Sequence, residues 1–166
     1  MGPRFEELFL PHLDAAYGLA RFIARDAAAA DDIVQESFLR ALRSFGTYRG
    51  GDTRSWLLAI VRNCCFDWSR SVRGAQSAGT DAELESLPDE CSDGPETSVV
   101  RRGEIDEVRA MIQRLPEPFR ETLVLRELEE LSYKEIAQIT GVPMGTVMSR
   151  LARARNLLTR DLEQRR

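Results

Sequence analysis

The chain of 166 residues is poor in the side chains that build metal and redox sites, with only three cysteines and one histidine. Cys64, Cys65 and Cys91 form no CxxC pair, and His12 stands alone. The spacing of these residues therefore matches no common zinc site. An odd number of cysteines is typical of a protein kept in a reducing compartment. We expect neither a metal ion nor any other cofactor, and we expect a cytoplasmic location.

Long hydrophobic runs and catalytic motifs are also missing from the sequence. No apolar run approaches the roughly 20 residues that a membrane span needs, and the first residues lack the plan of a signal peptide. There is no phosphate-binding loop and no nucleophile-base pair at a recognisable spacing. We therefore expect no membrane insertion, and we expect that the protein is not an enzyme.

The formal net charge is −4, which by itself argues against a nucleic-acid partner, but the charges are unevenly distributed. Residues 76–98 contain no Lys or Arg and seven acidic side chains: Asp81, Glu83, Glu85, Asp89, Glu90, Asp93 and Glu96. Conversely, no acidic residue occurs between Glu135 and Asp161, where four arginines lie: Arg150, Arg153, Arg155 and Arg160. A local basic surface is what phosphate contacts require, whatever the overall charge.

The acidic segment divides the chain. Ser, Gly, Asp, Glu and Pro dominate residues 76–98, and the few apolar residues are too scattered to bury a face. A structureless loop of this length is uncommon inside one compact domain, although a solvated loop within a single domain is the alternative. We therefore predict two domains, residues 1–75 and 99–166, joined by a flexible acidic linker, 76–98.

The first predicted domain is helical. Apolar residues recur at helical spacing from Phe5 to Ile23, and Asp26 is suited to cap a second helix over about 28–45. A third helix is predicted over about 53–72, after a loop rich in glycine. The apolar sides of these two helices are expected to be buried: Val34, Phe38, Ala41, Leu42 and Phe45, then Trp56, Leu57, Ile60, Cys64 and Trp68. No strand pattern of useful length appears, so the chain is predicted to be all-α.

The second predicted domain ends in a helix-turn-helix. Ile105, Val108, Met111, Ile112 and Leu115 form one apolar stripe, and Pro116 and Pro118 suit the start of a helix through Leu128. Ser132-Tyr-Lys-Glu135 is a capping box, in which each side chain satisfies the other residue's backbone N–H. Gly141 is suited to end that helix in the left-handed conformation.

The final predicted helix, from Gly145, has Val147, Leu151, Ala154 and Leu158 on its core side. The other side and its flanks carry the candidate DNA contacts: Thr146, Met148, Ser149, Arg150, Ala152, Arg153, Arg155 and Asn156. Arg153 can read guanine with two hydrogen bonds, and the flanking arginines suit phosphates. An ordinary solvated basic helix is the alternative. The combination of the capping box with Ala137, Gly141 and Val147 favours DNA binding.

Several stretches together resemble a known family. Leu115-Pro-Glu-Pro-Phe-Arg-Glu121, Leu131-Ser-Tyr-Lys-Glu-Ile-Ala137 and Gly141-Val-Pro-Met-Gly-Thr-Val-Met-Ser-Arg150 resemble region 4 of bacterial sigma-70-type RNA polymerase sigma factors. Asp31-Asp-Ile-Val-Gln-Glu-Ser-Phe-Leu-Arg40 resembles region 2.2. Trp56-Leu-Leu-Ala-Ile-Val-Arg-Asn63, with Asp67 and Arg70, resembles regions 2.3 and 2.4. Two such domains joined without a region 3 are similar to the extracytoplasmic-function (ECF) group.

The resemblance implies roles for these residues. In such proteins, region 2.2 docks on the β′ clamp helices of core RNA polymerase, here through Asp31, Asp32, Gln35, Glu36, Leu39 and Arg40. Region 2 binds the melted −10 element, here through Tyr48, Arg49, Arg62, Asn63, Phe66, Asp67, Arg70 and Arg73. Region 4 binds the double-stranded −35 element. The resemblance also implies that an anti-sigma factor regulates the protein.

Two features of the −10 set follow from the residues themselves. Arg62, Phe66, Arg70 and Arg73 share one side of the third helix, predicted to face outward, and an aromatic ring among arginines suits single-stranded DNA. The glycines after Tyr48 and Arg49 permit a close approach of the backbone, so this loop is the candidate base pocket. Asn63 and Asp67 lie towards the flank of the helix and are expected to contact DNA or to orient that loop.

The sequence departs from the family pattern at two positions, and two other functions are possible. Many sequences of the same pattern have Lys or Arg at Met148 and a bulkier residue at Ala152, so fewer charged base contacts are expected here. One alternative is a stand-alone helix-turn-helix transcriptional regulator that does not act through core polymerase, but the N-terminal helices offer no evident ligand pocket. The other is a helical adaptor that binds only proteins, which leaves the basic face after Glu135 unexplained.

Overall fold

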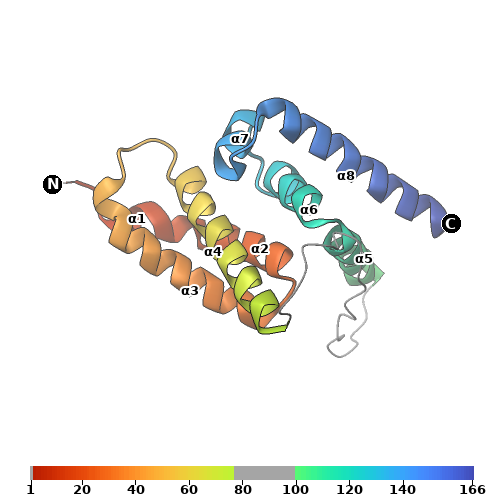
Figure 1. Ribbon diagram of the computed structural model, residues 1–166, viewed down its shortest axis with the longest axis horizontal. Helices are drawn as coiled ribbons and strands as arrows, with labels where there is room; N and C mark the ends of the chain where they lie inside the picture. The colour runs from red at the N-terminus through yellow and green to blue at the C-terminus, as the bar shows by residue number, and fades with distance from the viewer. Residues whose placement is uncertain (1, 77–99) are drawn as a thin grey trace.

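The computed structural model describes residues 2–76 and 100–166, and within these ranges it contains helices and no strand. The all-α prediction is therefore confirmed. Residue 76 belongs to the last helix of the first range, and the rest of the predicted linker lies outside the described residues. Figure 1 shows two groups of helices, α1 to α4 on one side and α5 to α8 on the other.

The first group contains α1 (Phe5–Phe9), the 3₁₀ turn η1 (Leu10–His12), α2 (Leu13–Ala24), α3 (Ala27–Ser44), the 3₁₀ turn η2 (Phe45–Thr47) and α4 (Thr53–Gln76). The helical pattern from Phe5 to Ile23 is thus interrupted, because Pro11, early in η1, lacks the N–H that a continuous helix needs. Asp26 caps α3 as predicted, accepting hydrogen bonds from the N–H groups of Ala28 and Ala29 at 2.9 and 3.1 Å.

Helices α2, α3 and α4 pack against one another around buried Leu19, Ile33, Leu57 and Val61. Five residues outside this centre, Phe38, Phe45, Trp56, Ile60 and Trp68, are only partly buried, but all pack against the core. The expectation for Leu42 was wrong, since its side chain is 53% exposed. Leu42 lies one turn from the exposed Leu39, so it extends the solvent side of α3 instead of the core side.

The second group contains α5 (Val100–Arg114), α6 (Glu117–Leu123), the π-helical turn η3 (Val124–Leu128), α7 (Tyr133–Thr140) and α8 (Met144–Gln164). The stripe predicted along α5 is buried only in its second half, at Met111, Ile112 and Leu115. Ile105 and Val108 are 59% and 53% exposed. An ion pair that joins α5 to α8, Arg114 with Asp161 at 2.6 Å, likewise lies in the last turn of α5.

The helix-turn-helix forms as the sequence predicted. The hydroxyl of Ser132 accepts a hydrogen bond from the N–H of Glu135 at 3.1 Å, and the carboxylate of Glu135 accepts one from the N–H of Ser132 at 2.8 Å. Gly141 follows α7 with a φ of 72°, the left-handed conformation in which a β-carbon is strained. The direction of α8 relative to α7 is therefore set by local sequence signals.

The two groups of helices touch each other. Helix α4 contacts α7, and α2 contacts α6 and η3. The two groups therefore pack against each other in this structure (Figure 1). None of the helices in the described ranges is long and apolar enough to cross a membrane.

Candidate nucleic-acid interface

Helix α8 presents its polar side to solvent because its apolar side packs on α6 and α7. Val147, Leu151 and Ala154 are at most 1% exposed. Six predicted DNA contacts are exposed, Met148, Ser149, Ala152, Arg153, Arg155 and Asn156, and the other two, Thr146 and Arg150, are half-buried. This arrangement leaves the middle of the helix free to enter a groove of DNA, with small Ser149 and Ala152 where the helix would approach most closely.

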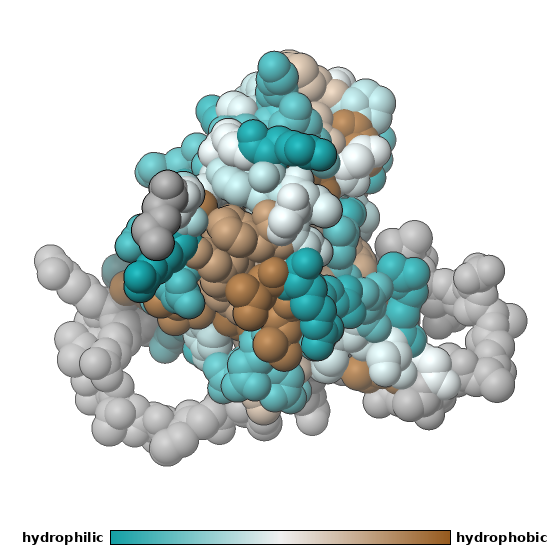
Figure 2. Space-filling view, turned by 90° about the vertical axis from the view of Figure 1, so that its left-hand side faces the viewer, coloured by the Kyte–Doolittle hydropathy of each residue, from teal (hydrophilic) through white to brown (hydrophobic). Residues whose placement is uncertain are grey.

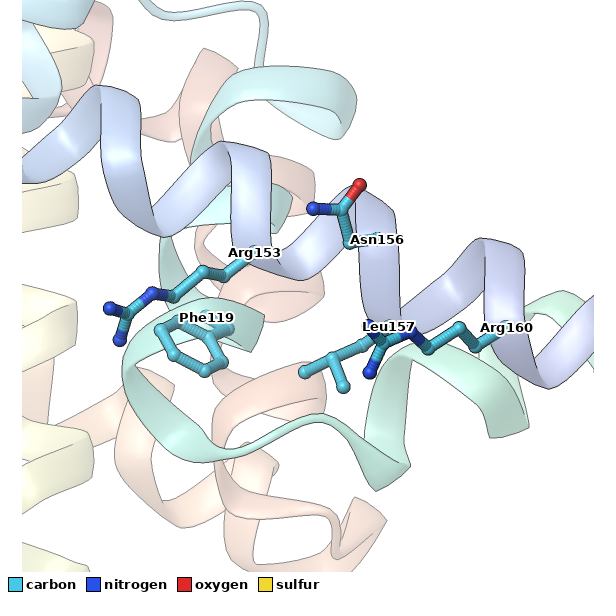
Figure 3. A pocket seen from close by; sticks show the side chains of 5 residues that line it. All are labelled: Phe119, Arg153, Asn156, Leu157 and Arg160. Carbon is cyan, nitrogen blue, oxygen red and sulfur yellow. The ribbon is translucent and has the colours of Figure 1, made fainter.

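The arginines of α8 have different surroundings. Arg155 donates to the Glu127 carboxylate at 2.7 Å, and this hydrogen bond raises the pKa of its guanidinium. Arg153 has no acidic side chain within ion-pair distance among the residues described, and it lines a shallow pocket with Phe119, Leu157 and Arg160. Figure 3 shows the Arg153 side chain extending past the Phe119 ring, whereas Asn156, also in the pocket lining, points away from that ring. Arg153 is thus exposed without an acidic partner among the described residues, whereas Arg155 is paired and Arg150 is half-buried.

The predicted outward face of α4 is turned partly towards the second group of helices. The guanidinium of Arg62 lies 4.5 Å from the centre of the Phe66 ring and donates to the buried carboxylate of Glu121 in α6. Its side chain is 20% exposed, so the prediction that Arg62 faces solvent was wrong. Arg73 pairs with Glu117 at 3.0 Å, and Arg70 is largely exposed. The contact arises from helix packing, which helical periodicity cannot reveal.

The loop between α3 and α4 is shaped by two glycines and a cluster of aromatic rings. Gly50 and Gly51 have φ values of 89° and 95°, and the hydroxyl of Tyr48 donates to the carbonyl of Gly51 at 2.8 Å. The Tyr48 ring packs against Phe9, Phe45 and Trp56, with ring centres 5.2 to 6.2 Å apart. The ring is therefore half-buried and held in place, while Arg49 is exposed.

The remaining two residues of the −10 set, Asn63 and Asp67, are exposed on α4. Asp67 accepts a hydrogen bond from Arg40 of α3 at 2.7 Å, and Arg40 also donates to Glu36 at 2.9 Å. Both hydrogen bonds raise the pKa of the Arg40 guanidinium, and the bond to Asp67 has the larger effect. Arg40 thus links the predicted polymerase-binding residues of α3 to the predicted −10 residues of α4, a connection that the sequence did not indicate.

The predicted polymerase-binding surface on α3 combines charge with apolar side chains. Asp31, Asp32, Gln35 and Leu39 are exposed, and Glu36 and Arg40 are half-buried. Leu42, which helical spacing predicted to be in the core, lies on this exposed side as well. Figure 2, which views the molecule from the end where α1 lies in Figure 1, shows hydrophobic side chains gathered on the surface among hydrophilic ones. On α3 itself, the exposed Leu39 and Leu42 beside charged residues are typical of a protein-binding surface.

The cysteines and acidic residues do not gather into a metal site in the part of the chain that the structure describes. Cys64 and Cys65 are buried in the core of the first group. Burial raises the pKa of both thiols, that of Cys65 to about 12. Both side chains thus behave as small apolar core residues. Cys91 lies outside the described residues.

Comparison with known proteins identifies the family. The profile of Sigma-70 region 2 matches residues 8–74, and that of Sigma-70, region 4 matches residues 105–158. The RNA polymerase sigma-H factor of Pseudomonas aeruginosa is 34% identical over 166 residues, with 96% of this chain and 86% of that protein covered. The probable RNA polymerase sigma-C factor of Mycobacterium bovis is 39% identical over 148 residues, with 86% of this chain and 76% of that protein covered.

A solved structure agrees with these sequence relatives. The sigma factor RpoE from Bartonella quintana, crystallised with the anti-sigma factor NepR, superposes with a TM-score of 0.76 at 25% identity. The match covers 98% of both chains, so it includes both groups of helices. The resemblance stated from the motifs is confirmed: this chain belongs to the ECF group of the sigma-70 family and is a sigma factor that directs transcription.

Proposed function

We propose that residues 99–166 bind the −35 element of promoters through the exposed side of α8. The observation that carries this proposal is the acid-free surface of α8 around Arg153, held in place by the capping box of α7 and the turn at Gly141. Arg153 would read base edges, and Arg150 and Arg155 would contact phosphates. Met148, 47% exposed, offers an apolar contact to a thymine methyl group instead of a charged one.

Residues 1–75 would bind the melted −10 element along α4 and the loop before it. Arg49 and Arg70 are exposed and can neutralise phosphates, and Phe66 offers a ring for base stacking. Asn63 and Asp67 lie beside them on the same helix. The half-buried Tyr48 ring would shape the loop, since three other aromatic side chains hold it.

The α3 surface would dock on core RNA polymerase, at the β′ clamp helices. Asp31, Asp32 and Glu36 supply negative charge for a basic partner surface, and Leu39 and Leu42 supply apolar area beside it. Charge complementarity would orient the encounter, and the apolar contacts would slow dissociation.

The protein would act in the cytoplasm without a cofactor and without catalysing a reaction itself. We also propose that an anti-sigma factor regulates it. The structural neighbour from Bartonella quintana was crystallised with one, and its fold matches this chain over nearly its whole length.

Run-off transcription tests the function. Purified core polymerase, with and without this protein, would transcribe a pool of promoter fragments from the source genome. We expect new transcripts of defined length only when the protein is present. Duplex binding without any polymerase-dependent transcript would instead indicate the stand-alone regulator.

A further inference from the structure

The only histidine of the chain, His12, makes a hydrogen bond at the start of α4. Its Nε2 atom lies 2.9 Å from the Oγ1 atom of Thr53, the first residue of that helix. Both side chains are half-buried. We call residues 48–51, just before this point, the base loop. The bond joins residues 41 positions apart, so it ties the N-terminal helices to the end of the base loop.

The other end of the base loop is held by the same part of the chain. Phe9, just before η1, is fully buried, and its ring centre lies 5.6 Å from that of Tyr48. The Phe9 ring also packs against Trp56, in the first turn of α4, with the ring centres 5.1 Å apart. Phe9 and His12 together therefore support residues on both sides of the loop glycines.

The middle of the base loop depends on these supports. Gly50 and Gly51 have positive φ values, a backbone conformation that glycine adopts readily at the cost of greater freedom when it is not held. Both glycines and Arg49 are exposed, and a β-carbon at either glycine would meet no other atom within 4 Å. Neighbouring side chains thus do not enclose the glycines, and the position of the loop is set by its two ends.

His12 also acts on Asp52, which lies between the base loop and Thr53. The Asp52 carboxylate accepts hydrogen bonds from the Ser55 hydroxyl and from the Arg54 N–H. The bond from Ser55 has the largest effect in holding the pKa of Asp52 below its ordinary value, and the charge of the His12 imidazole adds a smaller one. The imidazole therefore affects two successive residues where the loop becomes α4, one by a hydrogen bond and one by charge.

We propose that His12 is a positioning residue for −10 binding: through Thr53 it fixes the start of α4 and holds the base loop where it can receive a base of the melted strand. This inference rests on the proposed role of residues 1–75 in binding the −10 element. A bond that served stability alone would affect all binding activities alike. A positioning bond affects binding of the −10 strand and leaves the other two surfaces unchanged.

The test uses holoenzyme assembled from core polymerase and the full chain. The probe is a fluorescein-labelled single-stranded oligonucleotide with the nontemplate −10 sequence of a promoter that the wild type transcribes in the run-off assay, and fluorescence anisotropy measures its affinity. His12→Leu and Thr53→Val each remove the hydrogen bond, whereas His12→Gln keeps both a donor and an acceptor at the end of the side chain. Ile33→Val, a buried change in α3, is the control for a loss of stability alone.

We expect His12→Leu and Thr53→Val each to weaken binding of the oligonucleotide by about fivefold, and the double variant to be no weaker, since both changes remove the same bond. His12→Gln and Ile33→Val should bind it like the wild type. The affinities for core polymerase and for a −35 duplex should not change in any of these variants.

Three results would each overturn the inference: wild-type affinity in His12→Leu, an equal loss in His12→Gln and His12→Leu, or a loss that extends equally to the −35 duplex. If circular dichroism shows that His12→Leu is unfolded, the hydroxyl is tested instead. Thr53→Ser should then keep the affinity for the oligonucleotide and Thr53→Val should lose it, and equal affinities of these two variants would overturn the inference.

The proposed function can fail separately. Arg49 is an exposed member of the base loop, and Arg70 is exposed on α4. If Arg49→Ala weakens binding of the oligonucleotide and His12→Leu does not, the −10 surface stands and the positioning role is wrong. If neither Arg49→Ala nor Arg70→Ala weakens it, the assignment of the −10 surface is wrong, and the positioning role fails with it.

Discussion

The guanidinium of Arg62 and the carboxylate of Glu121 form an ion pair between residues 59 positions apart, with side chains 20% and 2% exposed. Arg62 also covers the ring of Phe66 on its own helix. The same guanidinium is therefore a contact between the two groups of helices and a member of the proposed −10 surface. Because a buried carboxylate without a cation is destabilised, whatever draws Arg62 away must also allow Glu121 to reach water.

Replacement of Arg153 by alanine should weaken binding of the −35 element. A side chain that reads a base edge contributes roughly 1–3 kcal/mol, so we expect the affinity to fall by about fivefold to 150-fold. The measurement is fluorescence anisotropy of holoenzyme on a −35 duplex taken from an active promoter. Arg165→Ala, just beyond α8, removes the same charge and should have little effect. Equal losses for both variants would show a general charge effect, and impaired binding to core polymerase would point to misfolding.

Replacement of Asp32 and Glu36 by lysine should lower the affinity for core polymerase by about tenfold or more, because like charges would then face a basic partner. A titration of the labelled protein with core polymerase measures this affinity. The folded state should tolerate the change, since both positions are at least partly exposed and the pair of Glu36 with Arg40 is half-exposed. Glu6→Lys with Glu7→Lys on α1 is the control. An unchanged affinity for the α3 variant would contradict the docking surface.

The stability contributed by Asp52 at the start of α4 should depend on pH. Its carboxylate accepts hydrogen bonds from the Ser55 hydroxyl at 2.5 Å and from the Arg54 N–H at 3.2 Å. These hydrogen bonds hold the pKa of Asp52 below its ordinary value of 3.8, and the bond from Ser55 has the largest effect. The charged form is therefore favoured by folding, and its contribution is present above about pH 3.8 and is lost as the pH falls through the lower, folded-state pKa.

Thermal unfolding of the wild type and Asp52→Ala tests this cap from pH 7 down to pH 2.5. A helix cap contributes about 1 kcal/mol, so the variant should be less stable by that amount at neutral pH. The difference should shrink below pH 3.8. Asp106→Ala, at an exposed position of α5, should show no comparable trend. A difference that stays constant over the whole range would rule out the charged cap.

Replacement of Gly141 by alanine should destabilise the helix-turn-helix by about 1 kcal/mol, because a β-carbon is strained at its φ of 72°. No neighbouring atom lies within 4 Å of the added carbon, so the cost comes from the backbone alone. Gly103→Ala in α5 also meets open space, but in a helical conformation, and should be neutral or slightly stabilising. Chemical denaturation compares them, and equal effects of the two substitutions would contradict the argument.

Local signals predicted most of the fold. The helices, the cap at Asp26, the capping box of Ser132 and Glu135, and the turn at Gly141 all involve residues within a few positions of each other. The break at Pro11 was readable from the same chemistry but was missed, because the apolar pattern continues through it. The expectations for Leu42, Ile105 and Val108 failed because helical spacing shows which residues share a side, not whether another helix covers it.

The sequence by itself determined that the chain is helical, that it carries a helix-turn-helix with an exposed basic side around Arg153, and that its motifs are those of an ECF sigma factor. These features depend on short-range periodicity, caps and motif order. Only the tertiary structure decided which partners the charged residues have: Arg40 with Asp67, Arg54 with Glu129, and Arg62 with Glu121. Such pairs join residues 27 to 75 positions apart, and their geometry exists only once the helices have packed.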